Sequence, residues 1–581
     1  MDPSRRARWI LPRIDPREVE SLAAAVEIHP LAARVLVRRG FGDPLAAARF
    51  LAPSLSHLHD PFLFRDMRAA VDRLRAAIAN REKILVYGDY DADGTTSIVV
   101  LKKAIELAGG AAEFHVPHRI RDGYGMRREI IEQAAADGVR LIVSVDTGIR
   151  AVEAVRRASE LGIDVIVTDH HLPETELPPA LAVLNPSRPD CPYPEKNLCG
   201  AGVTLKLVQA LVTTLGWPAD KVQRMTASFL KLVAIGTVAD VVPLTGENRV
   251  IVKKGLEGLR QVKNPGLRAL LEVAGFNSGD APSAGQVAFR IAPRMNAAGR
   301  MASASDVVEL FLTEDPGRAR LLAESLQSLN QERQQTESDI VALVLAECER
   351  QPVSDGQAAL VFSGQGWHRG VVGIVASRLV EKFNRPVLVL SEEPAEGVAQ
   401  GSGRSVGSFH LLAALESMAG LLVRYGGHRQ AVGLSVELDR LEELRARLNE
   451  YAAARLTPDD RVPCFVLDGE LGLDEVDDAS VGEVLALAPF GNGNPAPLFV
   501  VRNLEVAGEP VVLRERHLRL KLRQNGRTLA VKAWNFAGRL AELAPGARVD
   551  AVVNFEEDLY SLNRGFAGWG AILRDIRPPI R

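Results

Sequence analysis

The sequence predicts an α/β protein in which two α/β units are joined by a long helix and followed by a small β-barrel. Three patterns support this fold class. Apolar runs alternate with amphipathic segments at 61–305 and again at 351–460, which is typical of buried parallel strands covered by helices. Residues 306–350 keep a nearly continuous helical pattern, and residues 461–581 form short alternating segments separated by Gly and Asn turns.

The same patterns predict the domain boundaries. The first 60 residues mix short helical patterns with proline-containing breaks, so we expect a packing arm without chemistry of its own. The predicted organisation is an N-terminal arm at 1–60, a first α/β domain at 61–305, a connector helix at 306–350, a second α/β domain at 351–460 and a barrel at 461–581.

Composition places the chain among ordinary globular proteins. It is 47% hydrophobic and 25% charged with a formal net charge of −3, so it has no global basic excess and must meet any polyanion locally. Its four cysteines share no CxxC spacing, which predicts reduced thiols and argues against a cysteine-bound zinc ion. There is no apolar signal core at the N-terminus and no run of roughly 18 apolar residues, so we expect a cytoplasmic protein without a membrane partner.

The segment VYGDYDADGTTS at 86–97 spaces three carboxylates, Asp89, Asp91 and Asp93, at alternate positions before a glycine. This spacing matches the first half of a helix–loop–helix calcium motif, but Val100 occupies the position where that motif has a bidentate Glu. The preceding residues KILVYG favour a strand, whereas the calcium motif begins with a helix. We therefore interpret the segment as a strand end that brings acidic groups to a site with different chemistry.

Three further segments carry acidic or imidazole groups in or directly after apolar stretches. They are SVDTG, VTDHH and LVAIGTVADVVPL. Because loops at the carboxyl ends of neighbouring parallel strands meet in one crevice, we expect these groups to lie together. The candidate site residues are Asp89, Asp91, Asp93, Asp146, Asp169, His170, His171 and Asp240.

Such a cluster predicts bound cations, because many carboxylates cannot be held close together in a protein unless cations neutralise them. Mixed oxygen and imidazole ligands suit manganese, magnesium or iron, and a shared carboxylate can bridge two ions. Two ions about 3.5–4 Å apart can activate water and stabilise the leaving oxygen of a phosphoryl group. The predicted reaction is therefore hydrolysis of a phosphoester or phosphoanhydride.

Simpler interpretations exist for single residues. An Asp at a strand end is commonly a helix cap, and Asp93 or Asp146 could have only that role. Adjacent histidines on a strand point to opposite sides. We therefore expect His170 to be the ligand that faces the same ion as Asp169, and His171 to contact substrate or an outer partner. Agreement among four segments favours the cation site.

Nine segments, in order between residues 86 and 499, resemble the DHH phosphoesterase superfamily and, within it, RecJ-type single-strand-specific exonucleases. The segments are YGDYDADGTTS, SVDTG, VTDHH, IGTVADVVPL, PRMNAAGRM, GWHRGVVGIVASRL, GSGRS, GGHRQAVG and FGNGNPAPLF. The resemblance implies a DHH domain that binds two divalent cations, Mn²⁺ or Mg²⁺, a DHH-associated α/β domain and a C-terminal oligonucleotide-binding (OB-fold) barrel.

On the matching positions, the resemblance also implies individual roles. Asp89 takes the place of a histidine that smaller relatives carry, and His171 is implied to contact the scissile phosphate. Which ligand holds which ion stays open. The implied metal ligands are Asp89, Asp91, Asp93, Asp146, His170 and Asp240.

The second α/β unit resembles the DHH-associated substrate-binding domain. Ser402 and Arg404 of GSGRS match a segment that receives a 5′-terminal phosphate, and the resemblance assigns Arg119 and Arg300 to the same pocket. His428 of GGHRQAVG matches a nucleotide-facing turn. Arginine forks and a closely approaching glycine backbone suit phosphate, although such glycines are equally common in ordinary turns.

The barrel region contains a strand with two faces. Three leucines alternate with Arg519, Lys521 and Arg523, so one face is apolar and the other cationic. Beside a phosphoesterase site this strand is predicted to bind single-stranded nucleic acid, the alternative being an ordinary solvated strand. Nearby aromatic residues could stack on bases, although two or three of them are expected in the core. They are Trp534, Phe536, Tyr560, Phe566 and Trp569.

The predicted function is that of a 5′→3′ exonuclease that degrades single-stranded DNA by two-metal hydrolysis in DNA repair and recombination. Polarity and strand preference follow from the resemblance alone, as does the expectation of a monomer that works with single-strand-binding protein and a helicase. One alternative is a superfamily enzyme that cleaves pyrophosphate, polyphosphate or short cyclic or linear oligonucleotides, but such enzymes generally lack a basic barrel. The other is a replication scaffold without metals, which the complete ligand set disfavours.

Overall fold

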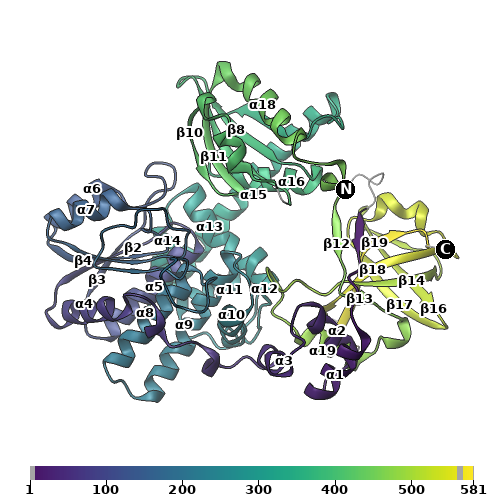
Figure 1. The fold of residues 1–581 in the computed structure, drawn as a ribbon, viewed down its shortest axis with the longest axis horizontal. Helices are drawn as coiled ribbons and strands as arrows, with labels where there is room; N and C mark the ends of the chain where they lie inside the picture. The colour runs from purple at the N-terminus through teal and green to yellow at the C-terminus, as the bar shows by residue number, and fades with distance from the viewer. Residues whose placement is uncertain (1–6, 408, 559–566, 580–581) are drawn as a thin grey trace. The chain divides into compact units, whose positions relative to one another are not determined.

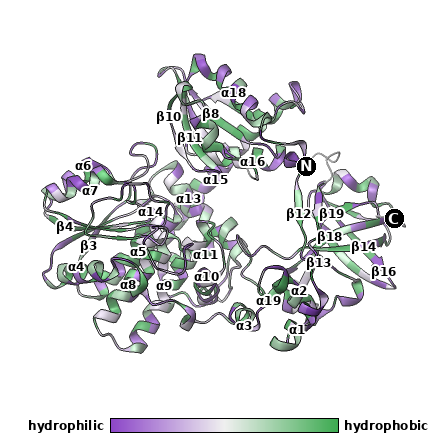
Figure 2. Ribbon diagram, viewed as in Figure 1, coloured by the Kyte–Doolittle hydropathy of each residue, from purple (hydrophilic) through white to green (hydrophobic). Residues whose placement is uncertain are grey.

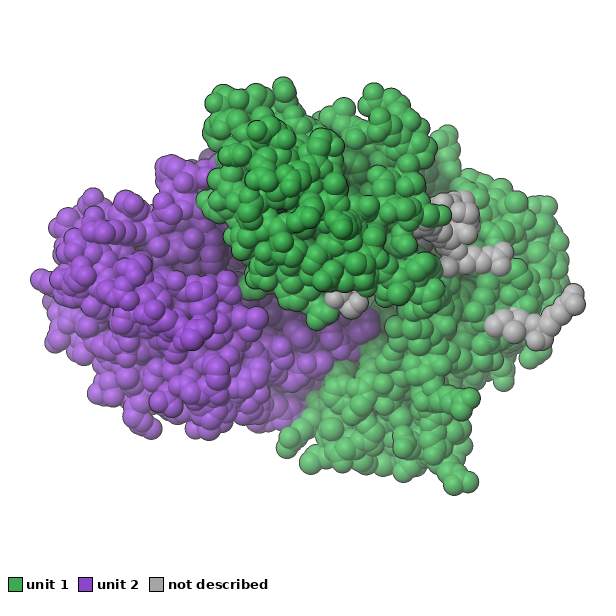
Figure 3. Space-filling model, turned by 45° about the horizontal axis from the view of Figure 1, so that its top comes forward, with its two compact units in different colours: residues 1–51, 336–488, 496–581 green, residues 52–335, 489–495 purple. Residues whose placement is uncertain are grey.

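The computed structural model describes residues 7–407, 409–558 and 567–579. The chain divides into two compact units (Figure 3). Unit 1 comprises residues 1–51, 336–488 and 496–581, and unit 2 comprises residues 52–335 and 489–495. No helix in the described part of the chain has both the length and the apolar character needed to cross a bilayer.

Unit 2 is built on a sheet of five parallel strands (Figure 1). In spatial order the strands are β3 (Ala112–His115), β2 (Lys83–Tyr87), β4 (Val139–Val145), β5 (Asp164–Thr168) and β6 (Ala182–Leu184). The chain leaves β2 toward β3 on one side and continues with β4 on the other. Ligand sites of open parallel sheets lie at such a reversal, beyond the carboxyl ends of the strands.

Alternate residues of these strands enter two separate apolar cores. Ile84 and Val86 join a large core whose helices include α4 (Met67–Ala79), α5 (Ala92–Leu107) and α8 (Gly200–Thr214). Leu85 and Tyr87 join a second core with α6 (Arg128–Ala136) and α7 (Val152–Glu160). Hydrophobic residues accordingly concentrate along the strands (Figure 2). Both faces of the sheet are covered, as unbroken apolar strands predict.

The remainder of unit 2 is helical. Its further helices are α9 (Ala219–Ala239), α10 (Gly246–Gly258), α11 (Pro265–Val273), α12 (Ala284–Gln286), a π-helical turn (Val287–Ile291), α13 (Ala292–Met301) and α14 (Ser305–Leu312). Helix α15 (Pro316–Arg350) is 35 residues long, and the boundary between the two units falls within it. The long helix that the sequence predicts is therefore present.

Unit 1 contains a mixed five-stranded sheet. Its spatial order is β10 (Leu422–Gly427), β11 (Ala431–Glu437), β9 (Val398–Arg404), β8 (Val387–Glu393) and β7 (Leu360–Gln365). Only the β7–β8 pair is parallel, which fits the crossover through helix α16 (Val372–Phe383) between them. Helices α17 (Leu411–Glu416) and α18 (Leu441–Ala453) contribute to the apolar core against this sheet.

Unit 1 also contains a closed barrel of five strands. The order β14-β18-β19-β17-β16 closes because β14 also pairs with β16. The barrel strands are β14 (Phe499–Val506), β16 (His517–Gln524), β17 (Arg527–Ala533), β18 (Arg548–Glu557) and β19 (Trp569–Arg577). Two short strands, β13 (Gly469–Glu470) and β15 (Val511–Leu513), extend the sheet, and helix α19 (Asp478–Ala486) precedes the first barrel strand.

The N-terminal arm packs within unit 1. Strand β1 (Arg8–Ile10) pairs in parallel with β12 (Cys464–Val466), and three helices follow it, α1 (Pro16–Val26), α2 (Pro30–Arg38) and α3 (Pro44–Leu51). The Trp9 indole donates to the Asp575 carboxylate at 2.7 Å, and Arg39 pairs with Asp468. The predicted fold class is confirmed, while the five predicted domain boundaries stay a prediction.

Candidate metal centre and nucleic-acid surfaces

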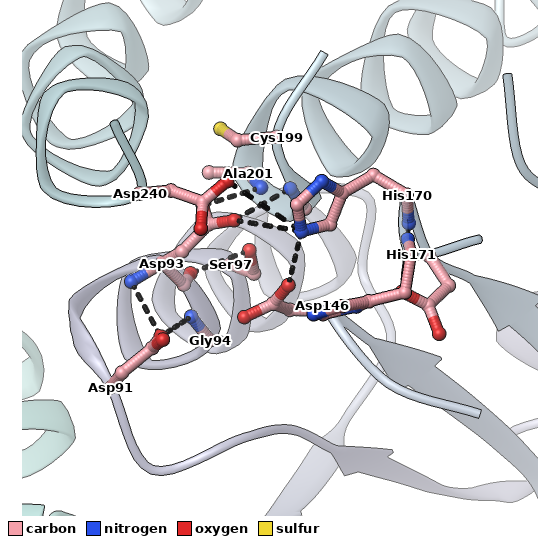
Figure 4. A network of polar contacts seen from close by, with 12 residues as sticks. Asp91, Asp93, Gly94, Ser97, Asp146, His170, His171, Cys199, Ala201 and Asp240 are labelled. Atoms are coloured by element: carbon pink, nitrogen blue, oxygen red, sulfur yellow. Dashed lines mark hydrogen bonds and ion pairs between the residues drawn. The ribbon is translucent and has the colours of Figure 1, made fainter. Parts of the chain in front are cut away.

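Acidic and imidazole side chains gather at the carboxyl edge of the parallel sheet (Figure 4). They follow β2, β4 and β5, while Asp240 ends helix α9. Their ligand atoms form three overlapping groups, and within each group all atoms lie within 4.8 Å of one another. The groups are Asp89, Asp91 and Asp146; Asp93, His170 and Asp240; and Asp146, Asp169, His170 and His171.

The turn between β2 and α5 orders two carboxylates in different ways. Asp91 is the N-cap of α5, and its Oδ1 accepts from the backbone N–H groups of Asp93 and Gly94, both at 2.9 Å. Asp93 instead accepts from Gly200 at 2.6 Å and Ala201 at 2.9 Å, the first residues of α8. The cap of α5 is thus Asp91, and Asp93 is held by the positive end of a different helix.

His170 lies at the centre of the cluster. Its Nε2 is 3.1 Å from Oδ1 of Asp146, 3.6 Å from Oδ2 of Asp240 and 3.9 Å from Oδ2 of Asp93 (Figure 4). The backbone of Asp146 has φ 59°, in the left-handed region that residues other than glycine rarely adopt. Such a strained residue is typical of functional sites, because the surrounding structure must hold it in place.

Asp169 and His171 form a hydrogen-bonded pair behind the cluster. Oδ1 of Asp169 is 2.7 Å from Nδ1 of His171, and its Oδ2 accepts from the backbone of Ile149 at 2.9 Å. The Tyr124 hydroxyl lies 3.1 Å from the same Nδ1. Because the buried Asp169 carboxylate contacts Nδ1, it orients the His171 ring, and Nε2 of that ring stays available to another partner.

The electrostatics of the site favour neutral groups in the absence of cations. Burial, together with the neighbouring Asp91, raises the pKa of Asp93 to about 6. Burial and nearby carboxylates also raise the pKa values of Asp89, Asp146 and Asp240 well above the ordinary range. Burial lowers the pKa of His170 to about 4, so its imidazole is neutral at physiological pH and suited to bind a metal.

Three buried atoms of the cluster lack a hydrogen bond from any described residue. They are Oδ1 of Asp89, Oδ1 of Asp146 and Nε2 of His170. A buried polar atom without a partner is costly, and divalent cations would satisfy all three. Carboxylate oxygens with one imidazole suit Mn²⁺ or Mg²⁺, so the residues present fit the predicted cofactor.

One expectation about the histidines is wrong. The rings of His170 and His171 do not point to opposite sides, since their centroids are only 4.4 Å apart. Both residues lie beyond Thr168, where β5 ends, and the alternation of strand side chains does not extend past a strand. The motif therefore brings both imidazoles to the cluster.

Two further residues of unit 2 belong to the surroundings of the site and were not predicted. Asn296 of α13 accepts from the backbone N–H of Ala92 at 2.7 Å, which fixes the start of α5, and Tyr124 contacts His171. The sequence signals for these two residues were weak, since Asn296 lies in the segment PRMNAAGRM and Tyr124 lies five positions after Arg119. The Arg119 guanidinium lies over the Tyr90 ring, with 4.8 Å between the guanidinium carbon and the ring centroid.

Unit 1 holds the remaining predicted substrate residues. Ser402 and Arg404 lie on β9, and a Cβ at Gly373, in the first turn of α16, would stand 3.2 Å from Nη2 of Arg404 and 3.4 Å from Oγ of Ser402. A serine, an arginine and a helix N-terminus are suited to a phosphate. His428 follows β10, and its backbone N–H donates to Ala431 at 2.8 Å. Arg119 and Arg300 belong to unit 2, and their role in the same pocket stays a prediction.

Strand β16 alternates as predicted. Leu518, Leu520 and Leu522 are buried, whereas Arg519, Lys521 and Arg523 are exposed. Arg523 pairs with Glu505. The role of strand β16 in binding nucleic acid stays a prediction.

The aromatic residues near this strand differ in exposure. Trp534 is half exposed, Phe536 is buried, and the Trp569 indole donates to Asp478 at 2.9 Å. Among these described side chains Trp534 is the most exposed, which suits stacking on a base, and Trp569 is partly exposed. Tyr560 and Phe566 lie outside the described residues.

Three domain families match consecutive parts of the chain. The DHH family N-terminal domain matches residues 83–237, the DHHA1 domain residues 355–454 and the RecJ OB domain residues 467–565. The first of these contains β2 to β5 and every cluster residue except Asp240.

Curated relatives match most of the chain. The single-stranded-DNA-specific exonuclease RecJ of Bacillus subtilis is 39% identical over 549 residues, covering 94% of this chain and 68% of the relative. The enzyme of the same name from Escherichia coli is 39% identical over 499 residues, covering 83% of this chain and 85% of the relative.

Solved structures agree with these relatives. RecJ from Thermus thermophilus in complex with Mn²⁺ superimposes with a TM-score of 0.83 at 32% identity, covering 99% of this chain and 80% of that one. The complex with Mg²⁺ gives a TM-score of 0.77 at 31% identity, covering 99% and 79%.

Proposed function

Since the chain belongs to the RecJ family of single-stranded-DNA-specific exonucleases, we propose that it hydrolyses single-stranded DNA from the 5′ end with the help of two divalent cations, Mn²⁺ or Mg²⁺. The observation that carries this proposal is the buried cluster at the carboxyl edge of the unit 2 sheet, where Asp89, Asp146 and His170 keep buried atoms without hydrogen-bond partners.

Two of the three residue groups described above suggest which residues would hold each ion. Asp89 and Asp91 would hold one ion, and Asp93, His170 and Asp240 would hold the other. Asp146, whose Oδ1 is 3.1 Å from Nε2 of His170, would stand between them as the shared ligand. Bound there, divalent cations would supply a more acidic water and stabilise negative charge on phosphate oxygens.

The remaining groups of the cluster would act on the DNA phosphate. His171 is oriented by Asp169 through the 2.7 Å contact at Nδ1, so its Nε2 is free to donate to an oxygen of the scissile phosphate. Although burial opposes it, the contact with Asp169 raises the pKa of His171, which favours the protonated, donating form. The Tyr124 hydroxyl, 3.1 Å from the same Nδ1, would also limit rotation of this ring.

Substrate recognition is proposed for both units. Ser402 and Arg404 beside the N-terminus of α16 would receive a 5′-terminal phosphate, which gives the enzyme its polarity. Arg119 and Arg300 are proposed to serve the same phosphate, and His428 to face a nucleotide. The exposed cations Arg519, Lys521 and Arg523 of β16 would bind the phosphate backbone of the single strand.

The biological setting follows from this substrate. An exonuclease specific for single strands fits DNA repair and recombination, where single-strand-binding protein and a helicase expose its substrate. We propose that the enzyme acts as a monomer in the cytoplasm.

A 5′-phosphorylated single strand that carries a label at either end provides the test. With Mn²⁺, the 5′ label should be released as mononucleotide at once, whereas the 3′ label should persist in progressively shorter strands. Blunt duplex DNA and the protein stripped of metal should give no product. Release of the 3′ label first would contradict the polarity, and equal turnover of polyphosphate or short dinucleotides would favour another activity of the superfamily.

A further inference from the structure

Residues 489–495 belong to unit 2, although the chain on both sides of them belongs to unit 1. This loop, Pro489–Pro495, lies about 250 residues beyond Asp240 in the sequence. It packs on the turn of residues 241–244, which directly follows that proposed ligand. The end of α9 thus meets a segment from the last fifth of the chain.

The contact between loop and turn joins backbone groups of the turn to the side chain and the backbone carbonyl of Asn492. The Asn492 side-chain amide donates to the carbonyl of Val241 at 2.6 Å, and the backbone N–H of Leu244 donates to the carbonyl of Asn492 at 2.7 Å. At Gly493, with φ +71°, a Cβ would come within 2.9 Å of Cβ of Pro243. A glycine is therefore needed for this close approach.

The loop is rigid enough to act as a support. Gly491 and Asn494 exchange backbone hydrogen bonds at 2.8 and 3.2 Å, and the buried Asn494 amide donates to the carbonyl of Pro489 at 2.9 Å. Leu244, which the loop contacts, is itself buried in the core of unit 2.

The turn needs such support because its backbone is strained. Val241 has φ 60°, a conformation that is rare for a β-branched residue, and its side chain is exposed, so no packing of that side chain holds it there. The neighbouring backbone of Asp240 ends α9 through a 2.9 Å hydrogen bond to Gly236. A change at Val241 would therefore be transmitted directly to the direction of the Asp240 carboxylate.

We propose that the loop Pro489–Pro495 is a part of the metal centre, in which Asn492 is a positioning residue that holds the turn at Val241 and thereby aims Asp240 at the cation shared with Asp93 and His170. This inference rests on the proposed metal role of Asp240. Asn492 itself touches neither metal nor DNA in this assignment.

The experiment measures Mn²⁺ binding by the full chain in the absence of DNA, using isothermal titration. In Asn492→Ala, one of two Mn²⁺ sites should lose roughly tenfold in affinity while the other is unchanged, as expected for a residue that supports a ligand. With DNA and subsaturating Mn²⁺, kcat should fall and the KM for DNA should stay the same. Gly493→Ala, which pushes the loop away from Pro243, should weaken the same site.

Gln133→Ala is the matched control, because it also removes an exposed side-chain amide of unit 2, one that donates to Asp137 at 3.0 Å on α6. It should leave both Mn²⁺ affinities unchanged. If Asn492→Ala lowers only the melting temperature of the metal-free protein, as a purely structural contact would, the proposal is overturned.

A double-mutant cycle separates this proposal from the metal assignment. In an Asp240→Asn background, Asn492→Ala should have no further effect on Mn²⁺ affinity, because it acts through that carboxylate. An undiminished additional loss would overturn the role of Asn492. If Asp240→Asn alone left both affinities intact, the metal assignment would fail instead.

Discussion

The metal centre of unit 2 and strand β16 of the barrel both concentrate charge, but they do so in opposite environments. Asp93 and Asp146 are almost completely buried beside other carboxylates, whereas Arg519 and Lys521 are exposed to solvent. A buried like-charged cluster is stable only with a partner of opposite charge, whereas exposed cations are stable in water alone. The buried cluster therefore requires bound cations, whereas the exposed cations of β16 are stable with or without bound DNA.

The largest effect that would test this difference is expected at the centre of the cluster. Asp146→Ala or His170→Ala should lower kcat by about 10³-fold, because each removes a ligand and charge stabilisation worth several kcal/mol. DNA affinity, measured by fluorescence anisotropy, should change little. Asp72→Ala, an exposed carboxylate on α4, is the control. Unchanged turnover in either ligand variant would contradict the metal assignment.

A smaller loss is expected one contact away from the proposed ligands. Asp169→Asn keeps the shape of the side chain but removes the charge that orients His171, so kcat should fall by about 10–100-fold. The pKa of Asp169 is lowered, chiefly through His171 and in spite of its burial, so the variant should also lose stability above pH 4. Chemical denaturation at pH 7 measures this, and an activity loss without any stability loss would contradict the hydrogen-bonded pair.

The two regions should also differ in their response to pH. Because the pKa of Asp93 is raised to about 6, Mn²⁺ must displace a proton from this carboxyl group below that pH, so Mn²⁺ affinity should rise by up to about tenfold per unit between pH 5 and 6. His170, with a pKa of about 4, is already neutral in this range and adds no step.

The raised pKa of Asp93 also predicts how the metal-free protein responds. The folded state holds this proton more tightly than the unfolded state, so the contribution of Asp93 to stability falls as the pH rises from 4 to 6. Isothermal titration and thermal melts with and without Mn²⁺ measure both effects. DNA affinity of the barrel cations should stay constant over this range, and a parallel change would remove the distinction between the two regions.

The smallest effect is expected at the barrel. Replacing Arg519, Lys521 and Arg523 together by Ala should raise the KM for long single strands several-fold at physiological salt, with kcat unchanged, and should lower the slope of log affinity against log salt by about 2. Arg320→Ala, an exposed and paired arginine on α15, is the control. An unchanged slope would identify β16 as an ordinary solvated strand.

These substitutions are a better test of the barrel than a deletion. Removing residues 461–581 would also remove β12, which pairs with β1, and the loop Pro489–Pro495, which packs beside Asp240. A loss of activity after that deletion would therefore not distinguish DNA binding from damage to the metal centre.

Much of the fold and of the site could be predicted because both follow local patterns. Apolar runs marked β2, β4 and β5, and parallel strand order then brought Asp89, Asp146 and His170 to one edge. The alternation of leucine with cations in β16 was equally readable.

What could not be predicted depends on contacts between distant segments. The hydrogen bonds of Asp93 to the start of α8 and of Asn492 to Val241 join residues more than 100 and 250 positions apart. The histidine pair was misjudged because the rule for strands was applied past the end of β5. Sequence periodicity predicts which face of a helix or strand is buried, but it does not predict which distant segment packs against that face.

The parallel pairing of β1 with β12 has a consequence for biosynthesis. The ribosome releases β1 early but completes β12 only about 450 residues later. At roughly 5–20 residues per second, the N-terminal strand must stay unpaired on the nascent chain for at least about 20 s. An open strand edge is a site for wrong association, so we expect slowed translation or crowded nascent chains to expose this protein to aggregation before it is ever folded.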